Sequence, residues 1–338
     1  MTHPHPKKIE KIAVLGDGGW GTTLAIQLAC KGFPVYLWGA FAENIAAIQK
    51  ERVNQKFLPG IALPDSITPT TDLSLAIKES QLIVLAVPSQ YVASVLKRIK
   101  KFGLQEKIFL SVVKGIDNKS LLRISQIIHA ELGPVHLAVL SGPTIAIEVA
   151  KDVPSTAVMA STNPKIARTL QEIFNSETFR IYRNTDVIGV EIGGSLKNVI
   201  AIACGVCDGL GFGSNTKAAI LTRGLVEMAR LGKAMGGKVK TFSGLAGLGD
   251  LVTTVSSSQS RNRHVGEELA KGRSIDDILA SMNNMVAEGV ETAKAVVKLS
   301  QKYNVPMPIS TEVYNIIYKG KPPQKAVADL MRRRLKAE

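Results

Sequence analysis

The chain has 338 residues, of which 45% are hydrophobic, so it is long enough for about two globular domains with a core in each. Its three cysteines are too few for a disulfide scaffold and favour a reducing compartment, and we therefore expect a cytoplasmic protein. The net charge of +14 suits an anionic small substrate. Because only 5% of the residues are aromatic and none interleaves the basic clusters, we expect no nucleic-acid partner.

The distribution of polar residues argues against membrane insertion. The first residues are polar and include prolines, unlike a signal peptide. Lys197 and Asp208 bracket the best candidate segment, so we expect the apolar segments to fall short of the ~20 residues that cross a bilayer. The sequence therefore predicts no stable membrane insertion.

In chain order, the first half alternates short apolar runs with helical patterns. The runs are residues 12–16, 34–39, 82–88, 107–115 and 135–143. Each run is apolar throughout, which is typical of strands that are buried on both faces of a parallel sheet. This pattern predicts a doubly wound α/β domain.

The pattern changes in the second half of the chain. Two more strands are predicted at 156–161 and 179–183, and from about residue 188 only helical segments follow, separated by glycine and serine loops. The sequence thus predicts an α/β protein with an N-terminal Rossmann-like doubly wound sheet followed by an all-α C-terminal domain. We place the dinucleotide-binding domain at 1–190 and the helical substrate-binding and catalytic domain at 191–338.

A glycine motif follows the first predicted strand. Gly16, Gly18 and Gly21 have G-x-G-x-x-G spacing between this strand and a helix. The first glycine permits a tight turn, the second lets the backbone approach a pyrophosphate at the helix N-terminus, and the third allows close helix packing. A purely structural turn is the alternative, whereas a mononucleotide P-loop is excluded because no Gly-Lys-Ser/Thr ending follows. We expect a dinucleotide cofactor.

The end of the second predicted strand leaves the form of that cofactor open. An acidic residue there would hold the ribose hydroxyls of NAD. Trp38, Gly39 and Ala40 carry no carboxylate, and Glu43 comes late. Since no arginine is present there to bind the extra phosphate of NADP, the sequence predicts NAD(P)H without choosing between the two forms.

Lys197 is the candidate proton carrier. Histidine is the more usual choice, but His3 and His5 lie in the N-terminal tail, His129 lies in a helical pattern and His136 begins a strand. Lys197 lies in an apolar helical segment beside Gly193 and Gly194. A buried ammonium is costly unless it is paired or loses its proton, and desolvation lowers the pKa of a lysine toward neutrality, where it can act as base and acid. The alternatives are a lysine that reaches the surface or one that pairs with a carboxylate such as Glu191.

Three other places carry polar groups that could bind a ligand. Lys114 ends the fourth predicted strand, at the carboxyl edge where doubly wound sheets bind ligands, although ordinary loop charge is an alternative. Asp250 lies in a glycine-rich loop and could also simply cap a helix. Ser260, Arg261 and Asn262 begin a predicted helix, and they form either an anion site suited to a phosphate or a plain cap.

Cys204 and Cys207 form a C-x-x-C pair. A redox pair of this kind needs an exposed helix start after a strand, and this one lies late in an apolar helical pattern. We therefore do not expect redox chemistry at these cysteines.

Over essentially its full length the chain resembles the bacterial NAD(P)-dependent glycerol-3-phosphate dehydrogenases. The motifs occur in the family's order and are GDGGWGT, VPSQ, SVVKGI, LSGPT, EIGGSLKN, GLGFGSNT, GLAGLGDL, SRNR and VAEGV. The resemblance implies hydride transfer at C2 between dihydroxyacetone phosphate and sn-glycerol 3-phosphate, which supplies glycerol 3-phosphate for phospholipid synthesis. It also implies a homodimer without a metal.

The resemblance further implies residue roles. Lys197 would be the general acid/base at the C2 oxygen, Asn198, Asp250 and Thr254 would arrange the polar pocket, and Lys114 would polarise the substrate oxygen. The residues implied to contact the substrate are Lys114, Gly142, Thr144, Lys197, Asp250, Ser260, Arg261 and Asn262, the last three at its phosphate end. Those implied to contact the dinucleotide are Gly16, Gly18, Gly19, Trp20, Gly21, Lys114, Ala146, Arg261, Val286 and Glu288.

Three positions depart from the family pattern. Asp17 stands where the glycine motif often has alanine, Thr144 stands where SGPS is common, and Ala40 replaces a frequent polar or basic residue after the second strand. The last departure is a further reason why the choice between NAD and NADP stays open. None of the three removes an implied catalytic group.

Two other functions remain as alternatives. One is a hydroxyacid or hydroxyacyl-thioester dehydrogenase with a helical second domain, which a substrate panel would separate from the phosphate-dependent enzyme. The other is a redox-sensing regulator that binds dinucleotide without chemistry and uses its positive charge on nucleic acid. Salt-dependent DNA binding without turnover would support the regulator.

Overall fold

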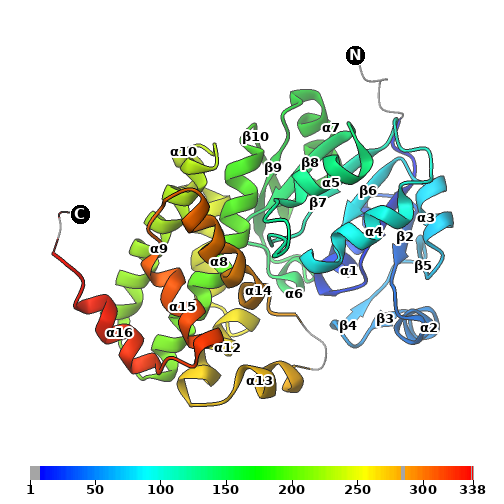
Figure 1. Ribbon diagram of the computed structural model, residues 1–338. Helices are drawn as coiled ribbons and strands as arrows, with labels where there is room; N and C mark the ends of the chain where they lie inside the picture. The colour runs from blue at the N-terminus through cyan, green and yellow to red at the C-terminus, as the bar shows by residue number, and fades with distance from the viewer. Residues whose placement is uncertain (1–7, 283–285, 336, 338) are drawn as a thin grey trace. The chain divides into compact units, whose positions relative to one another are not determined.

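The computed structural model of the chain describes residues 8–282, 286–335 and 337 (Figure 1). The chain divides into two compact units. Unit 1 comprises residues 1–114 and 122–191, and unit 2 comprises residues 115–121 and 192–338. The short segment 115–121 therefore belongs with the helical half of the chain, although the sequence places it within the first 190 residues. Within unit 2 the side chain of Asn118 donates a hydrogen bond to Glu291.

Unit 1 is built on an eight-stranded sheet with strand order β10-β9-β8-β7-β6-β1-β2-β5. These strands are β1 (Ile12–Leu15), β2 (Val35–Trp38), β5 (Ile67–Thr70), β6 (Leu82–Leu85), β7 (Ile108–Ser111), β8 (His136–Ser141), β9 (Ser155–Ala160) and β10 (Phe179–Asn184). All neighbours are parallel except β8 and β9. Two short antiparallel strands, β3 (Val53–Asn54) and β4 (Leu58–Ala62), form a separate ribbon.

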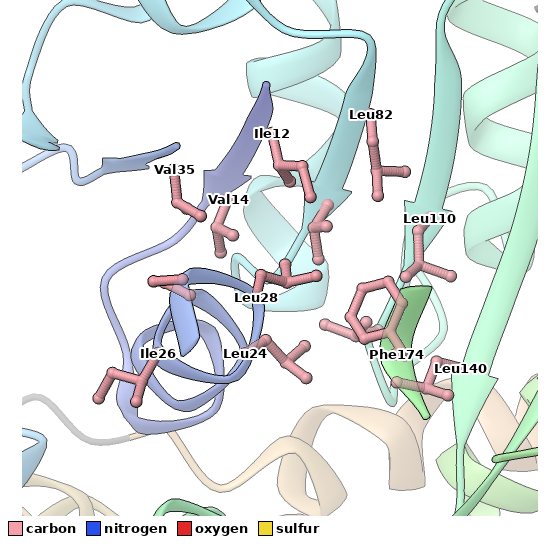
Figure 2. Packing of buried hydrophobic residues seen from close by; sticks show 14 of the residues in the cluster. Ile12, Val14, Leu24, Ile26, Leu28, Val35, Leu82, Leu110, Leu140 and Phe174 are labelled. Atoms are coloured by element: carbon pink, nitrogen blue, oxygen red, sulfur yellow. The ribbon is translucent and has the colours of Figure 1, made fainter. Parts of the chain in front are cut away.

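Helices cover both faces of this sheet, as the sequence predicts. Leu24, Leu28 and Phe174, from α1 (Gly19–Cys30) and α7 (Pro164–Phe174), pack with Ile12 and Val14 in one apolar cluster (Figure 2). A second apolar cluster lies on the other face of the sheet. It consists of strand residues and residues of α3 (Leu73–Glu79), α4 (Val92–Ile99) and α5 (Ile124–Leu132). The remaining helices of unit 1 are α2 (Ala42–Glu51), η1 (Ser89–Tyr91) and α6 (Ala146–Ala150). Strand residues therefore alternate between two buried faces, which explains why each run is apolar throughout.

Strand β5 is not predicted by the sequence pattern, and the structure gives the reason. Its sequence ITPT contains Pro69 and carries no continuous apolar run. β5 lies at the edge of the sheet, beside β2 only, and an edge strand tolerates a proline because one of its sides needs no ladder donor. The prediction for β7 was also too long, since this strand ends at Ser111 and Lys114 lies three residues beyond it.

From Ile192 onward, the described helices and strands of unit 2 are all helices, whereas its segment 115–121 contains no helix and has a single bridge residue at Ile116. The helices of unit 2 are the greater part of α8 (Val187–Gly209), then α9 (Ser214–Ala234), α10 (Val239–Phe242), the π-helical turn η2 (Leu245–Gly249), α11 (Asp250–Ser256), α12 (Arg261–Ala270), α13 (Ile275–Ser281), α14 (Glu288–Lys302), α15 (Pro308–Lys319) and α16 (Pro323–Met331). Helix α8 begins in unit 1, because the units divide after Glu191. A helical second domain is thus present, as the sequence predicts.

The expectation about the length of the apolar segments was wrong for α8. This helix has 23 residues and, by length and composition alone, is apolar enough to cross a membrane. The helix continues through Lys197 without interruption, whereas the sequence prediction treated this lysine as the end of the apolar segment. Its most apolar window is nevertheless 89% buried inside the protein, which is typical of the core helix of a soluble protein.

Candidate active site

The glycine motif of unit 1 forms a tight turn between β1 and α1. Gly16 has φ +128°, and a Cβ atom there would lie 2.7 Å from the backbone of Ala86. A Cβ on Gly21 would lie 1.9 Å from the carbonyl oxygen of Gly16, so α1 packs directly on the turn. Around Gly18 the space is open, and a Cβ on this residue would have no atom within 4 Å. The turn therefore has the strained first glycine, the open second one and the close-packed third that a pyrophosphate cradle needs.

The start of α1 is suited to an anion. Gly18 is its N-cap, no side chain caps it, and its first turn carries no acidic residue. Its first amides and the helix dipole therefore favour a negative group. Within this turn the indole Nε1 of Trp20 is buried without a hydrogen-bond partner among the described residues. Thr23 holds the end of the turn, since its hydroxyl donates to the carbonyl oxygens of Gly19 and Ala146 at 2.9 and 3.0 Å.

Three residues predicted to contact the substrate lie together beyond the carboxyl ends of β7 and β8. The Nζ atom of Lys114 donates to the carbonyl oxygen of Gly142 at 2.9 Å and to the hydroxyl of Thr144 at 3.3 Å. Gly142 has φ +146°, a conformation that favours glycine. A Cβ there would also lie 3.0 Å from the backbone of Ala157. Lys114 is thus held by its neighbours rather than being loose loop charge.

In unit 2, Lys197 is buried in an ion pair. Its side chain is 8% exposed, and its Nζ atom donates to Asp250 Oδ1 and to Thr254 Oγ1, each at 2.6 Å. Asp250 begins α11 and Thr254 lies one turn later, where its hydroxyl also donates to the backbone carbonyl of Asp250 at 2.7 Å. Burial of Lys197 thus agrees with the sequence analysis. The amine is, however, satisfied by a carboxylate and a hydroxyl instead of being isolated in an apolar environment.

Glu191, which the sequence left open as a partner of Lys197, has other partners in unit 1. Its carboxylate accepts hydrogen bonds from the backbone amide of Ser125 at 2.7 Å and from the Ser125 hydroxyl at 2.6 Å. It also forms an ion pair with Arg123. These contacts fix the first turns of α8 to the start of α5. Nothing in the sequence pattern pointed to this cluster, because its members are 66 to 68 residues apart.

A chain of amide hydrogen bonds lies beside Lys197. Asn262 donates from Nδ2 to Oδ1 of Asn198 at 3.0 Å, and its own Oδ1 accepts from the backbone amide of Gly289 at 2.9 Å. This connects α8, α12 and the start of α14. Glu288, the first residue of α14, acts electrostatically on Arg261. Val286 is half-buried two residues before α14.

The start of α12 carries both a capping side chain, from Ser260, and an exposed cation, from Arg261. Ser260 is the N-cap, and its hydroxyl accepts a hydrogen bond from the amide of Arg263 at 3.2 Å. Arg263 is paired with Asp208 at 2.6 Å and with Glu267 at 2.7 Å. Arg261 is exposed and begins the helix. Of the two arginines, Arg261 is therefore the one placed to meet an anion from solvent.

Glycines let α8 and the Asp250 loop come very close. A Cβ on Gly193 would lie 2.4 Å from the carbonyl oxygen of Ala246 in η2. A Cβ on Gly247 would lie 2.1 Å from the carbonyl oxygen of Phe242. Close approach of the backbones is what lets Asp250, which follows η2 directly, reach the amine of Lys197 one turn along α8. This explains why glycines crowd the lysine in sequence.

The two cysteines of α8 are unsuited to redox chemistry. Both side chains are buried. Burial raises the pKa of Cys204 to about 12 and that of Cys207 to about 11, so neither forms a reactive thiolate near neutrality.

Within the described residues, no group of three or more His, Cys, Asp and Glu side chains could hold a metal ion.

Two family models match the chain. The model for the N-terminus of NAD-dependent glycerol-3-phosphate dehydrogenase matches residues 11–167, and the model for the C-terminus matches residues 186–328. Among curated proteins, glycerol-3-phosphate dehydrogenase [NAD(P)+] from Chlorobium limicola is 49% identical over 333 residues, covering 97% of this chain and 99% of the relative. The protein of the same name from Geobacter sp. is 48% identical over 332 residues, with the same coverage.

Solved structures give the same result. The glycerol-3-phosphate dehydrogenase of Coxiella burnetii is 39% identical with a TM-score of 0.93, over 96% of this chain and 99% of that chain. A yeast glycerol-3-phosphate dehydrogenase is 30% identical with a TM-score of 0.80, over 96% of this chain and 100% of that one. D-mandelate dehydrogenase, at 15% identity and a TM-score of 0.61, shares the fold alone. With both family models matched across most of its length, this chain belongs to the NAD-dependent glycerol-3-phosphate dehydrogenase family.

Proposed function

We propose that the protein reduces dihydroxyacetone phosphate to sn-glycerol 3-phosphate with NAD(P)H, and catalyses the reverse reaction, with Lys197 as general acid/base. The observation that carries this is the buried contact of Lys197 with Asp250 and Thr254. A carbonyl reduced to an alcohol needs a proton at its oxygen, and a positioned ammonium both supplies that proton and stabilises the developing negative charge.

The turn of unit 1 fits a dinucleotide. The open space at Gly18, the uncapped start of α1 and the unpartnered buried Nε1 of Trp20 together offer donors and room to a diphosphate group. Gly16, Gly18, Gly19, Trp20 and Gly21 would hold the diphosphate. Ala146, Val286, Glu288, Arg261 and Lys114 complete the proposed set of contacts. The bound nicotinamide supplies or accepts the hydride.

The proton is handled by the unit 2 residues. The Asp250 carboxylate favours the ammonium form of Lys197, and Thr254 fixes the direction of its N–H bonds. In the direction of reduction, Lys197 gives a proton to the C2 oxygen, and in the direction of oxidation it takes that proton back. Lys114 is proposed to polarise the same oxygen, and Asn198 to orient the substrate hydroxyl through its link to Asn262. A cation at the developing alkoxide stabilises the transition state more than the ground state.

The phosphate end is assigned to the start of α12. Ser260, Arg261 and Asn262 would contact the phosphate, and Gly142 and Thr144 would contact the remainder of the substrate. Arg261 offers a charge-assisted donor and the helix start offers a positive dipole end. Supply of glycerol 3-phosphate for phospholipid synthesis, a homodimer and a cytoplasmic location remain predictions that go with this function.

The test is the decay of nicotinamide absorbance when dihydroxyacetone phosphate is added to enzyme with NADH and, in parallel, with NADPH. The proposal expects turnover that requires the phosphate, so unphosphorylated dihydroxyacetone serves as the matched control. A panel of 2-keto acids and 3-ketoacyl thioesters covers the other dehydrogenase classes. Turnover on a keto acid with none on the triose phosphate would overturn the proposal.

A further inference from the structure

The residue after the first glycine of the motif is an acid with an unusual environment. Asp17 is 8% exposed, and its Oδ2 atom accepts a hydrogen bond from Nδ2 of Asn44 at 2.7 Å. Asn44 lies in the first turn of α2, the helix that follows β2. A buried carboxylate that contacts no cation costs free energy. The burial of the Asp17 carboxylate therefore needs a reason.

The carboxylate of Asp17 lies at the carboxyl end of β2, next to Gly39. Strands β1 and β2 pair with Leu15 opposite Trp38, and the amide of Gly16 donates to the carbonyl oxygen of Trp38 at 2.9 Å. The residues that follow the two strands are therefore neighbours. A Cβ placed on Gly39 would lie 2.6 Å from both Cγ and Oδ2 of Asp17. The Asp17 carboxylate thus fills the space that a side chain on residue 39 would take.

This place has a defined chemistry in dinucleotide-binding folds. An acid at the end of the second strand accepts a hydrogen bond from the ribose 2′-hydroxyl of NAD, whereas NADP is accommodated by an arginine nearby. Gly39, Ala40 and Phe41 follow β2 here and supply neither group. The structure supplies the acid from the neighbouring loop, through Asp17, at the same point of the sheet.

We propose that Asp17 selects NAD(H) over NADP(H), by accepting a hydrogen bond from the adenosine ribose 2′-hydroxyl and repelling a 2′-phosphate. This rests on the proposed dinucleotide-dependent function and names the coenzyme for it. A carboxylate has about four acceptor positions, and Asn44 uses one of them. The same carboxylate that accepts from a hydroxyl is a like charge toward a phosphate, so one group both favours the right ligand and disfavours the wrong one.

Burial raises the pKa of Asp17 above its ordinary value of 3.8, whereas the hydrogen bond from Asn44 and the charge of Lys56 act to lower it. Lys56 does not replace the missing arginine. It is exposed on the β3–β4 ribbon, with its Nζ atom 5.2 Å from the centre of the Phe57 ring. The hydrogen bond to Asp17 comes from Asn44, a neutral amide. The charge next to Gly39 is therefore that of the carboxylate.

The test is the dissociation constant of each coenzyme, measured by titration calorimetry on the full chain without substrate. The wild type is expected to bind NADH at least about tenfold more tightly than NADPH, the scale of one charge-assisted hydrogen bond. Asp17→Asn keeps the size of the side chain and removes its charge, and is expected to reduce the NADH preference about tenfold or more, chiefly by tightening NADPH. Asp17→Ala, the residue common in the family at this position, is the second variant should the first not fold.

Glu43→Gln is the matched control, because Glu43 is an exposed acid in the same turn of α2 as Asn44. Removing its charge is expected to leave the ratio of the two dissociation constants within about twofold, since an exposed charge is screened by salt. Equal or tighter binding of NADPH by the wild type would overturn the proposal, and so would an unchanged ratio in both Asp17 variants. An equal shift in Glu43→Gln would assign selection to the general field instead. Selective binding of NADH without turnover of dihydroxyacetone phosphate would sink the proposed reaction and leave the role of Asp17 standing.

Discussion

The ammonium of Lys197 lies 2.6 Å from the carboxylate of Asp250, and both side chains are almost completely buried. A pair of this kind is rarely a source of net stability, because taking two charges out of water costs about as much as their attraction returns. A pair of apolar residues would hold α8 and α11 together at least as well. A folding role alone does not explain this ion pair, whereas the proposed proton transfer by Lys197 gives it a reason.

Lys197→Met is expected to abolish turnover of dihydroxyacetone phosphate while the affinity for the dinucleotide stays within about a few-fold. Methionine preserves much of the length and apolar stem of lysine but carries no proton to transfer. Loss of a positioned acid of this kind reduces kcat by roughly 10²–10⁴-fold. The measurement is steady-state kcat together with coenzyme titration, and near wild-type turnover would remove Lys197 from the mechanism.

The stability of the pair is tested by a double-mutant cycle. Asp250→Leu alone removes the carboxylate that balances the buried ammonium charge and is expected to lower the free energy of unfolding by about 3–5 kcal/mol. The double variant Lys197→Met with Asp250→Leu is expected to recover most of that loss and to remain inactive. Urea unfolding followed by circular dichroism gives the values. A double variant as unstable as the single one would show that the pair is needed for folding.

Arg261→Ala is expected to raise the Michaelis constant for dihydroxyacetone phosphate about tenfold or more, the cost of one charge-assisted hydrogen bond to phosphate. The matched control is Arg273→Ala. That arginine follows the same helix but is already paired with Glu268 at 2.8 Å, so its removal should leave the Michaelis constant unchanged. Equal effects of the two substitutions would move the phosphate away from Arg261.

Gly193→Ala is expected to destabilise unit 2, because the added methyl group would lie 2.4 Å from the carbonyl oxygen of Ala246. Neither backbone can yield without separating α8 from η2, and overpacking of this kind costs about 1–3 kcal/mol or more. Gly244→Ala is the control, since a Cβ there makes only an ordinary contact of 3.5 Å with Thr241. Thermal unfolding of both variants is the measurement, with kcat as a second readout for displacement of Asp250.

The contribution of Asp208 should depend on pH. Partial burial acts to raise the pKa of Asp208, but hydrogen bonds from Lys217 and Arg263 outweigh burial and hold it below its ordinary value of 3.8. An acid whose pKa is lower in the folded chain stabilises the fold above its unfolded value, and this contribution is lost as pH falls through the folded value. Asp208→Asn is thus expected to lower the free energy of unfolding by about 1 kcal/mol at neutral pH. Urea titrations should show this difference vanishing below about pH 3.8; a difference that persists in acid would contradict the assignment.

The sequence by itself determined the architecture of unit 1 and the identity of the main polar candidates. Strands buried on both faces leave an apolar run that needs no knowledge of their partners, and the glycine turn is coded by residues within six positions of one another. Edge strand β5 was lost because Pro69 and the polar residues around it are tolerated only where one side of a strand is unpaired. Likewise, the length of α8 was underestimated because a buried lysine looks like an interruption until its partner is known.

Only the tertiary structure decided which group each buried charge meets. Glu191 was the carboxylate that the sequence offered as a partner for Lys197, but the fold pairs Glu191 with Arg123 and pairs the lysine with Asp250. Asp17 was an unexplained departure in the sequence, and pairing of β1 with β2 puts its carboxylate against Gly39. The physical reason is the same in each case. A periodic sequence pattern indicates which side chains are buried. It does not indicate their partners, because ion pairs and hydrogen bonds act over a few ångströms, between residues that folding brings together from distant parts of the chain.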